Sequence, residues 1–281
     1  MKRIVVTGAK GGTGRSIVKI LRAGGDEVIP VDLLPPGPTD FPYVQFDLVK
    51  DSGLNEVVSR ADGLIHMGSV PCDAFWSRTT VFENVVNGGF NVLQACANAG
   101  IKRVVIASSM EVYGSMTKVR KLPVTESSPL RADNIYASGK ILLEKVATDF
   151  ARWHGMSIAA FRLGRIVYED SFEERFKGHL EAPARGTDVL WNYVDGRDVA
   201  TACRLWLESD IEGFHPFNVA APDIYLETPV RDLIAEFLPE VSEIDDVVAG
   251  NVCPYMSTAV HEALGWTIAY DWRRIRDEAA S

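Results

Sequence analysis

Short runs of apolar residues alternate with longer stretches of helical periodicity over the first 165 residues. The short runs are rich in Val and Ile and are mostly apolar throughout, which is typical of parallel strands covered on both faces. They predict strands at 3–7, 27–32, 43–46, 63–67, 103–108 and 157–163. Helices are expected between them, at about 13–23, 54–59, 81–99 and 134–154. Strands and helices in this order predict an α/β fold with a doubly wound parallel sheet.

The periodicity weakens after residue 163. Residues 164–192 carry Gly, Pro and charge, and they predict a loop with short helices. Further on we expect a helix at 196–208, a strand at 214–219 and short helices at 228–237 and 258–264. With no repeat or flexible linker in sight, we divide the chain into a sheet domain at 1–165 and a small lobe at 166–281 that is interleaved with the sheet.

The composition narrows the class of protein. Of 281 residues, 47% are hydrophobic and 24% charged, as in ordinary globular proteins, and the net charge of −9 disfavours nucleic acid or anionic membrane as a partner. Four dispersed cysteines, without a C-x-x-C pair, predict no metal site and fit a reducing compartment. With no signal-like segment and no apolar stretch of about 20 residues, we expect a cytoplasmic protein.

A glycine-rich loop directly follows the first predicted strand. Residues 7–14 read Thr-Gly-Ala-Lys-Gly-Gly-Thr-Gly and lead into a helical pattern. In such a loop the first glycine allows a tight turn, the second lets backbone approach a pyrophosphate, and the third lets helix pack on strand. The helix would point its first N–H groups at the phosphates. The loop predicts a dinucleotide site on a Rossmann-type sheet, and its candidate contacts are Gly8, Gly11, Gly12, Thr13 and Gly14.

The second predicted strand ends in Asp32. A carboxylate there can accept both ribose hydroxyls of NAD, whereas it would repel the 2′-phosphate of NADP. No arginine follows it, since the next residues are Leu33, Leu34 and Pro35. The expected cofactor is therefore NAD, and a turn-capping role for Asp32 is the alternative.

Tyr136 and Lys140 are four residues apart in a predicted helix and therefore share one face. The ammonium would favour the phenolate and lower the phenol pKa, so that Tyr136 could serve as a general base or acid. Ser109 follows the fifth strand, at the edge of the sheet where ligands bind, and could donate a hydrogen bond to the reacting oxygen. We expect these three residues to be catalytic. Ser108 is a candidate cofactor contact, with a turn-stabilising role as the alternative.

These segments resemble the extended short-chain dehydrogenase/reductases, a family of NAD-dependent sugar epimerases and dehydratases. The resemblance runs from Lys2 to about Leu264. Its motifs lie at 7–14, 32, 46–48, 66–69, 108–114, 136–140, 161–163 and 193–200.

The resemblance implies further contacts with the cofactor. Asp47 and Leu48 should hold the adenine, and Lys140 should also hold the nicotinamide ribose. The turn after the fourth strand should line the cofactor with His66, Met67, Gly68 and Ser69. The resemblance also implies a homodimer formed through the two long helices at about 81–99 and 134–154.

Two departures from the family pattern bear on the substrate. Sugar-nucleotide members often carry an arginine two residues before the tyrosine that stands here as Tyr193, and that arginine grips the substrate pyrophosphate with a bidentate fork. Trp191 occupies that position, and a neutral indole cannot replace it. Arg185 or Arg197 could take that role, although neither is in the matching position. The stretch from Val167 to Trp191 is also short, which leaves little chain to wrap a uridine.

Uronate dehydrogenases are similarly compact and resemble this chain in the tryptophan-containing segment and in the loop after His66. They oxidise a free sugar acid that has no nucleotide. In that case Arg165, Arg175 and Lys177 could neutralise a substrate carboxylate, the alternative being that they are only solvated.

Glu111 lies two residues after Ser109, in a run that resembles the sugar-nucleotide 4,6-dehydratases. There the glutamate removes a proton next to a transient ketone. The acid found beside it in some dehydratases is Met110 here, so Glu111 is either such a base or an ordinary loop carboxylate. The candidate substrate contacts are Ser69, Met110, Glu111, Arg165 and Trp191.

Three more residues are left open. Phe75 and Trp76 follow the turn at 66–69 and could stack on a sugar face or belong to the core. The asparagine that the family places before a helix glycine has no clean match, because Asn84 is one residue out of step with Gly88.

We expect an enzyme, an NAD-dependent oxidoreductase that moves hydride between NAD and a secondary alcohol or hemiacetal of a sugar or sugar acid. An NDP-sugar epimerase or dehydratase, for example one like UDP-glucose 4-epimerase that recycles NAD in place, is the alternative. A non-catalytic NAD-binding regulator is a second alternative, against which the complete set of Ser109, Tyr136 and Lys140 argues.

Overall fold

A computed structural model describes residues 1–35, 43–50, 53–70, 76–168 and 178–279. Seven described strands form one parallel sheet in the order β10-β7-β5-β4-β1-β2-β3. Their bounds are β1 (Arg3–Thr7), β2 (Glu27–Asp32), β3 (Val44–Gln45), β4 (Gly63–His66), β5 (Arg103–Ser109), β7 (Ser157–Leu163) and β10 (Phe214–Val219). The predicted α/β class with a doubly wound parallel sheet is confirmed.

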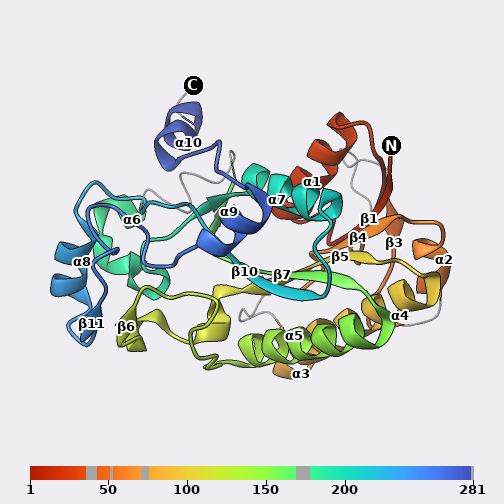
Figure 1. The fold of residues 1–281 in the computed structure, drawn as a ribbon, viewed down its shortest axis with the longest axis horizontal. Helices are drawn as coiled ribbons and strands as arrows, with labels where there is room; N and C mark the ends of the chain where they lie inside the picture. Colours follow the sequence, from red (N-terminus) through yellow and green to blue (C-terminus); the bar gives the residue numbers. More distant parts are fainter. Residues whose placement is uncertain (36–42, 51–52, 71–75, 169–177, 280–281) are drawn as a thin grey trace.

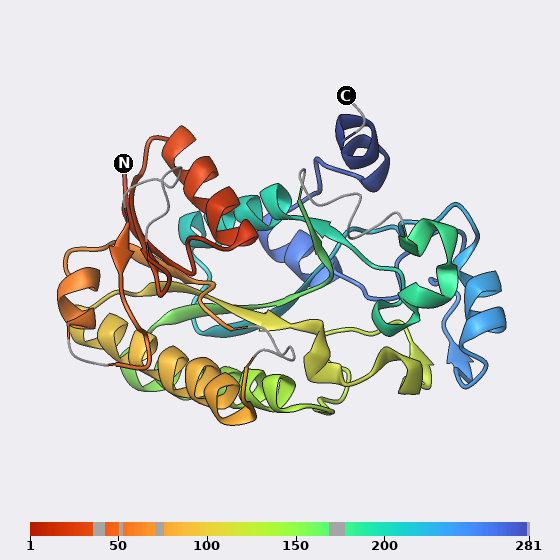
Figure 2. The same ribbon diagram turned by 180° about the vertical axis from the view of Figure 1, so that it is seen from behind.

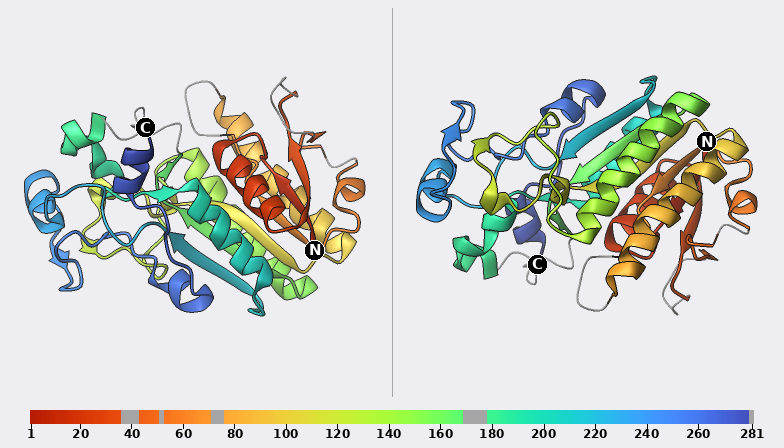
Figure 3. Two further views of the ribbon diagram at one scale, coloured as in Figure 1. Left: turned by 90° about the horizontal axis from the view of Figure 1, so that it is seen from above. Right: turned by 90° about the horizontal axis from the view of Figure 1, so that it is seen from below.

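Helices cover both faces of this sheet (Figure 1). One face carries α1 (Gly12–Ala23), α7 (Gly196–Glu208) and α9 (Thr258–Leu264). The other carries α2 (Leu54–Val58), α3 (Arg78–Phe82), α4 (Gly89–Ala99) and α5 (Ile135–His154). In Figure 3, α1 and α7 lie over the sheet in the view from above, and α4 and α5 lie side by side in the view from below. A separate apolar cluster fills each of the two interfaces.

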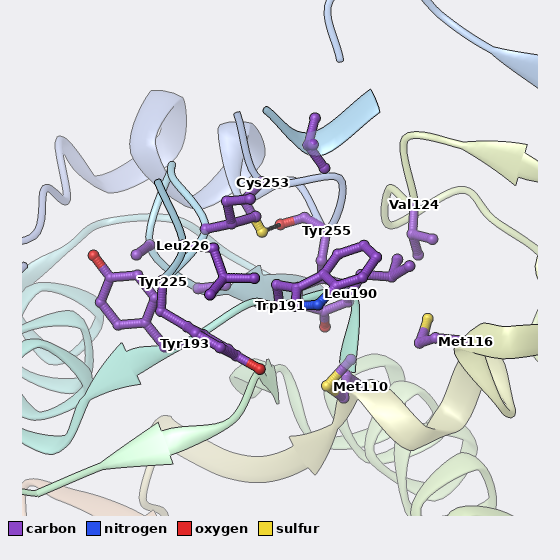
Figure 4. Packing of buried hydrophobic residues seen from close by; sticks show 14 of the residues in the cluster. Met110, Met116, Val124, Leu190, Trp191, Tyr193, Tyr225, Leu226, Cys253 and Tyr255 are labelled. Atoms are coloured by element: carbon purple, nitrogen blue, oxygen red, sulfur yellow. Dashed lines mark hydrogen bonds between the residues drawn. The ribbon is translucent and has the colours of Figure 1, made fainter. Parts of the chain in front are cut away.

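The C-terminal lobe lies at one end of the sheet (Figures 1 and 2). Several short elements build it together with segments from the first half of the chain. They are the 3₁₀ turns at 110–113, 116–118 and 183–189, the strands β6 (Lys121–Leu122), β8 (Ile166–Val167), β9 (Val194–Asp195) and β11 (Glu243–Ile244), and the helices α6 (Gly178–Glu181), α8 (Val230–Phe237) and α10 (Trp272–Ala279). A third apolar cluster, seen in Figure 4, holds this lobe together.

The long helix predicted at 81–99 differs from expectation in its interior. The structure places a π-helical turn at 83–88 between α3 and α4. A π-helical turn takes up one more residue than an α-helical turn, so side chains before and after it change their relative register. The helix predicted at 134–154 begins at Ile135, because the side chain of Asn134 caps it by accepting from the Ala137 N–H at 2.8 Å. Helix α10 was not predicted.

The strand order fixes where a ligand can bind. From β1 the chain proceeds to β2 and β3 on one side, and then returns to β4 and β5 on the other. The loops that leave the carboxyl ends of β1 and β4 therefore diverge and open a crevice, which is where doubly wound sheets bind their ligands.

Candidate active site

A cavity of about 740 Å³ opens at the carboxyl ends of the strands. It brings together most of the residues that the sequence singled out, from the glycine loop, the end of β5, the start of α5 and the segment after β7. The predicted residues that line it are Gly8, Gly11, Gly12, Thr13, Gly14, Met67, Ser69, Ser108, Ser109, Met110, Glu111, Tyr136, Lys140 and Arg165. Its volume is in the range of pockets that bind small molecules and cofactors.

The glycine loop is as tightly packed as a phosphate-binding loop requires. Gly8 has a φ of +68°, and a Cβ atom on it would lie 2.6 Å from the backbone nitrogen of Gly68. A Cβ atom on Gly14 would lie 2.1 Å from the carbonyl oxygen of Gly8. Helix α1 has no side-chain N-cap and no acidic residue in its first turn. Its first N–H groups therefore suit an anionic pyrophosphate, and the loop fits a dinucleotide.

Asp32 lies beside the glycine loop, outside the residues that line the cavity. Its Oδ2 atom accepts a hydrogen bond from the Lys10 N–H at 2.8 Å, and Oδ1 accepts from the Leu34 N–H at 3.1 Å. A carboxylate has about four acceptor positions, so these two bonds leave room for ribose hydroxyls. The carboxylate thus holds the loop in place and also fits the ribose of NAD.

Four other predicted cofactor residues do not line the cavity, namely Asp47, Leu48, His66 and Gly68. Asp47 accepts from the Val49 N–H at 3.1 Å, and Leu48 is buried in the core next to Gly68. The His66 side chain is fully buried, with Nδ1 2.7 Å from the Thr7 hydroxyl. Burial, and then the charge of Lys140, lower the pKa of His66 to about 3. The side chains of Leu48 and His66 therefore support the fold beneath the site.

Tyr136 and Lys140 share one face of α5 at the cavity, with the Lys140 Nζ atom 5.3 Å from the centre of the phenol ring. Lys140 is completely buried, and its Nζ atom donates to the carbonyl of Ala107 at 2.7 Å. Burial lowers the pKa of Lys140 to about 8, against the opposing effect of Glu144 and Glu111. The ammonium therefore stays charged at neutral pH although it is buried in the wall of the cavity.

Ser109 ends β5 at the same cavity, and its Oγ atom accepts the Glu111 N–H at 3.2 Å. That bond uses a lone pair and leaves the hydroxyl proton available for a substrate oxygen. The Glu111 carboxylate accepts from the Asn134 side chain at 2.7 Å and also lines the cavity. Met110 lines it as well, and its sulfur accepts from the Asn192 side chain.

Ser108 takes part in a buried network that fixes α5. Its hydroxyl donates to Glu144 Oε1 at 2.6 Å, and Arg162 on β7 donates to both oxygens of Glu144, at 3.0 and 2.7 Å. Arg162 also donates to the hydroxyl of Tyr113 at 2.7 Å. Glu144 is one helical turn beyond Lys140. The network therefore fixes the axial position and the rotation of α5, which carries Tyr136 and Lys140. Sequence reasoning missed Glu144; its spacing places it on the helix face of Tyr136 and Lys140, but nothing in the sequence pointed to its partners.

Asn84, to which the sequence analysis assigned no role, also supports the site. It is buried, and its side-chain oxygen accepts the Val70 N–H at 2.8 Å, which holds the loop after β4. The π-helical turn at 83–88 contains Asn84 and Gly88 and supplies one extra residue, which explains why their spacing was out of step.

Arg165 lies just after β7 and lines the cavity. Its guanidinium lies 3.0 Å from His179 Nε2 and 3.5 Å from an Asp188 oxygen. Because arginine only donates, the His179 Nε2 atom must accept, and the ring proton must then sit on Nδ1, facing the Tyr225 hydroxyl at 3.2 Å. Asp188 also lines the cavity. Phe75, Arg175 and Lys177 lie outside the described residues.

Trp191 corrects an expectation, because the structure does not bring it to the cavity. It is completely buried in the apolar cluster of the lobe (Figure 4). Its indole N–H donates to the carbonyl of Pro183 at 2.8 Å. Leu190 and Trp191 both have left-handed backbone, with φ of +52° and +54°. This turn directs the indole into the core, so Trp191 makes no contact with a substrate in the cavity.

No group of His, Cys, Asp and Glu side chains that could hold a metal ion occurs in the described part of the chain. Within the same residues, none of the helices is both long and apolar enough to cross a bilayer. The described cysteines Cys96, Cys203 and Cys253 are buried free thiols, and Cys72 lies outside the described residues.

An α/β sheet with a glycine loop, a tyrosine–lysine pair and a serine at one cavity defines a dinucleotide-dependent oxidoreductase. Residues 4–220 match the model of the NAD dependent epimerase/dehydratase family. The chain belongs to this family. It is an enzyme of the extended short-chain dehydrogenase/reductase type, with NAD as its cofactor.

Relatives with assigned activities include two sugar dehydrogenases. An L-arabinose 1-dehydrogenase (NAD(P)(+)) from Haloferax volcanii is 30% identical over 202 residues, covering 68% of this chain and 77% of the relative. A uronate dehydrogenase from Pseudomonas putida is 27% identical over 218 residues, covering 70% and 78%. A solved short-chain dehydrogenase/reductase superfamily protein from Agrobacterium tumefaciens, with bound NAD, has a TM-score of 0.79 at 23% identity and covers 99% of this chain and 96% of that one.

Proposed function

We propose that this protein is an NAD-dependent dehydrogenase that oxidises a secondary alcohol or hemiacetal of a free sugar or sugar acid. The observation that carries the proposal is the convergence of Ser109, Tyr136 and Lys140 on the same cavity as the glycine loop. The sugar dehydrogenases among the relatives, which cover about 70% of the chain, support the class of substrate.

Each of the three residues has a distinct task. Tyr136 takes the proton of the substrate hydroxyl, while Ser109 donates a hydrogen bond to the same oxygen and stabilises its developing charge. Bound NAD supplies the hydride acceptor. Lys140 donates one of its three N–H groups to Ala107, which leaves two for the nicotinamide ribose.

The charge of Lys140 is what allows Tyr136 to act at neutral pH. A cation 5.3 Å from the ring centre favours phenolate over phenol. The pKa of Lys140 is about 8, so this support declines as the pH rises through that value.

The substrate binds in the part of the cavity lined by Ser69, Met110, Glu111 and Arg165. Arg165 is the candidate that pairs with a carboxylate or hydroxyl of the substrate. Its present partner Asp188 is 61% exposed, and such a pair is worth about 0–1 kcal/mol, so a substrate oxygen can compete with it.

An NDP-sugar epimerase or dehydratase is the second candidate function. The observation in its favour is Glu111, which lines the cavity next to Ser109 and can serve as a base beside a transient ketone.

The test is absorbance at 340 nm with excess NAD, offering pooled free sugars and uronates in one tube and pooled nucleotide sugars in another. Turnover of free sugars to NADH beyond the amount of enzyme supports the dehydrogenase. No net NADH, with a nucleotide sugar isomerised or dehydrated by mass and chromatography, establishes the alternative. The Tyr136→Phe variant is the control, and it should lose turnover by at least about 100-fold.

We also propose a homodimer formed through α4 and α5, in which the sheet domain at 1–165 and the lobe at 166–281 work as one unit in the cytoplasm. The supporting feature is exposed apolar surface along these helices, where Phe90 is 42%, Leu142 44% and Trp153 60% exposed. Phe90→Glu and Trp153→Glu should give monomers by light scattering. The control Val247→Glu, at an exposed apolar residue of the lobe, should leave the mass unchanged.

A further inference from the structure

Tyr168 joins the C-terminal lobe to the glycine loop. It directly follows β8, and its hydroxyl lies 2.8 Å from the Thr13 hydroxyl in the first turn of α1. It also lines the main cavity. The two residues are 155 positions apart in the chain, so this contact forms only when the lobe is folded against the sheet.

The ring of Tyr168 packs directly against two glycines and fills the space that a side chain at either position would occupy. A Cβ atom on Gly12 would lie 2.5 Å from the ring, and one on Gly196, at the start of α7, would lie 2.9 Å from it. Real Cβ atoms do not approach other atoms this closely. The ring is therefore packed flush against two backbone segments, of which one is the phosphate loop itself.

Thr13, the hydrogen-bonded partner of Tyr168, lies in the helix turn where the pyrophosphate is expected to bind. Thr13 is the second residue of α1, and the backbone N–H groups of this turn carry the positive end of the helix dipole. A bond from Tyr168 fixes the Thr13 side chain, and the ring restrains the backbone of Gly12 before it. Both effects reduce the number of conformations the loop must give up when an anion binds.

We propose that Tyr168 is a positioning residue for the cofactor, which holds the phosphate loop in its binding conformation through Thr13 and Gly12. It acts on the pyrophosphate end of NAD and not on the nicotinamide. The inference concerns the cofactor, so it does not depend on which sugar is oxidised or on whether the enzyme is a dehydrogenase.

Calorimetric titration with NAD and with ADP-ribose tests this role. ADP-ribose keeps the pyrophosphate and both riboses but has no nicotinamide. Tyr168→Phe keeps the ring and removes the hydroxyl, and it should raise the Kd for both molecules by the same factor, about 3- to 10-fold, the effect of losing one hydrogen bond. Loss of NAD affinity with unchanged ADP-ribose affinity would mean that Tyr168 contacts the nicotinamide, and would overturn the proposal.

The partner residue gives an independent check. Thr13→Val should raise the Kd for NAD and for ADP-ribose by the same factor as Tyr168→Phe does. The double variant should bind no more weakly than either single variant, because both substitutions remove the same hydrogen bond. Thr13→Ser keeps the hydroxyl and should restore binding. Thr201→Val, which removes a comparable hydroxyl bond within α7, should leave both Kd values unchanged. Additive losses in the double variant would contradict the proposal.

The packing of the ring is tested separately. Gly12→Ala should raise both Kd values more than Tyr168→Phe does, because the new methyl group displaces the ring. Adding Tyr168→Ala to Gly12→Ala removes that collision, so the double variant should bind no more weakly than Tyr168→Ala alone. Circular dichroism melting of each variant separates loss of binding from loss of folding, and binding losses that follow the melting temperature alone would overturn the inference.

Discussion

The buried imidazole of His66 should make this protein sensitive to acid well above the pH at which carboxylates titrate. The pKa of His66 is lowered from 6.5 to about 3, chiefly because burial disfavours the charged ring and secondly because Lys140 is nearby. The unfolded chain therefore binds more protons than the folded one between about pH 6.5 and 3. Stability falls as the pH falls through this window, and the contribution is fully present only above 6.5.

The size of the loss follows from the two pKa values. A difference of about 3.5 between the folded and unfolded states corresponds to about 5 kcal/mol at the acid end of the window. Between pH 7 and pH 5 the same two pKa values lower the free energy of unfolding by about 2 kcal/mol. That is a large part of the 5–15 kcal/mol by which native domains are typically stable.

The assay is urea denaturation of the cofactor-free protein at pH 7 and pH 5, followed by tryptophan fluorescence. His66→Asn cannot titrate in this range and serves as the comparison. All other titrating groups are shared, so the wild type should lose about 2 kcal/mol more than the variant between the two pH values. Equal losses in the two proteins would refute the reasoning, since His66 would then be solvated or charged in the folded state.

Three further substitutions test the supports of the site by the free energy of unfolding. Arg162→Met should cost about 3–5 kcal/mol, because it leaves Glu144 charged and buried, and the double change of both residues to Met should cost less than the single one. Gly89→Ala should cost about 1–3 kcal/mol, because the new methyl group would lie 2.6 Å from Leu143, and Leu143→Ala in the same chain should relieve most of that cost. Asn84→Ala should cost about 1–3 kcal/mol by leaving a backbone N–H of the loop after β4 without its partner, and Asn84→Asp, which keeps an acceptor, should cost less.

The sheet and the cavity were predictable because local patterns determine both. Apolar runs rich in Val and Ile marked the strands, and the carboxyl ends of parallel strands must meet at one edge. Ser109, at the end of β5, and Tyr136, at the start of α5, therefore had to lie near the glycine loop whatever the details of the lobe. The pairs Ser108–Glu144 and Thr13–Tyr168 could not be foreseen, since each joins residues far apart in sequence through side chains of common types.

Spacing rules failed where the backbone departs from regular geometry. Asn84 was set aside because it is one residue out of step with Gly88 relative to the family pattern, and the structure places both residues in a π-helical turn. Trp191 was placed at the substrate by its position in a motif, but left-handed backbone at two successive residues turns it inward. Neither deviation has a marker in a single sequence, because π-helical and left-handed turns here involve residues that also occur in ordinary helices and loops.

The burial of Trp191 changes the reason for favouring a free sugar over a nucleotide sugar. The indole cannot contact either substrate, so its effect is that this position supplies no guanidinium to the cavity. Among the described residues that line the cavity, Arg165 is the arginine, and His179 and Asp188 already engage it. Glu111 and Asp188 add negative charge to the same wall. A pyrophosphate brings two negative charges, whose lost hydration must be replaced by N–H donors or cations, whereas a free sugar brings none and a uronate one. Lys140 also lines the cavity, but it is engaged by Ala107 and assigned to the ribose of NAD, so Arg165 is the cation that the described wall leaves for the substrate. This balance of charges now carries the preference for the smaller substrate.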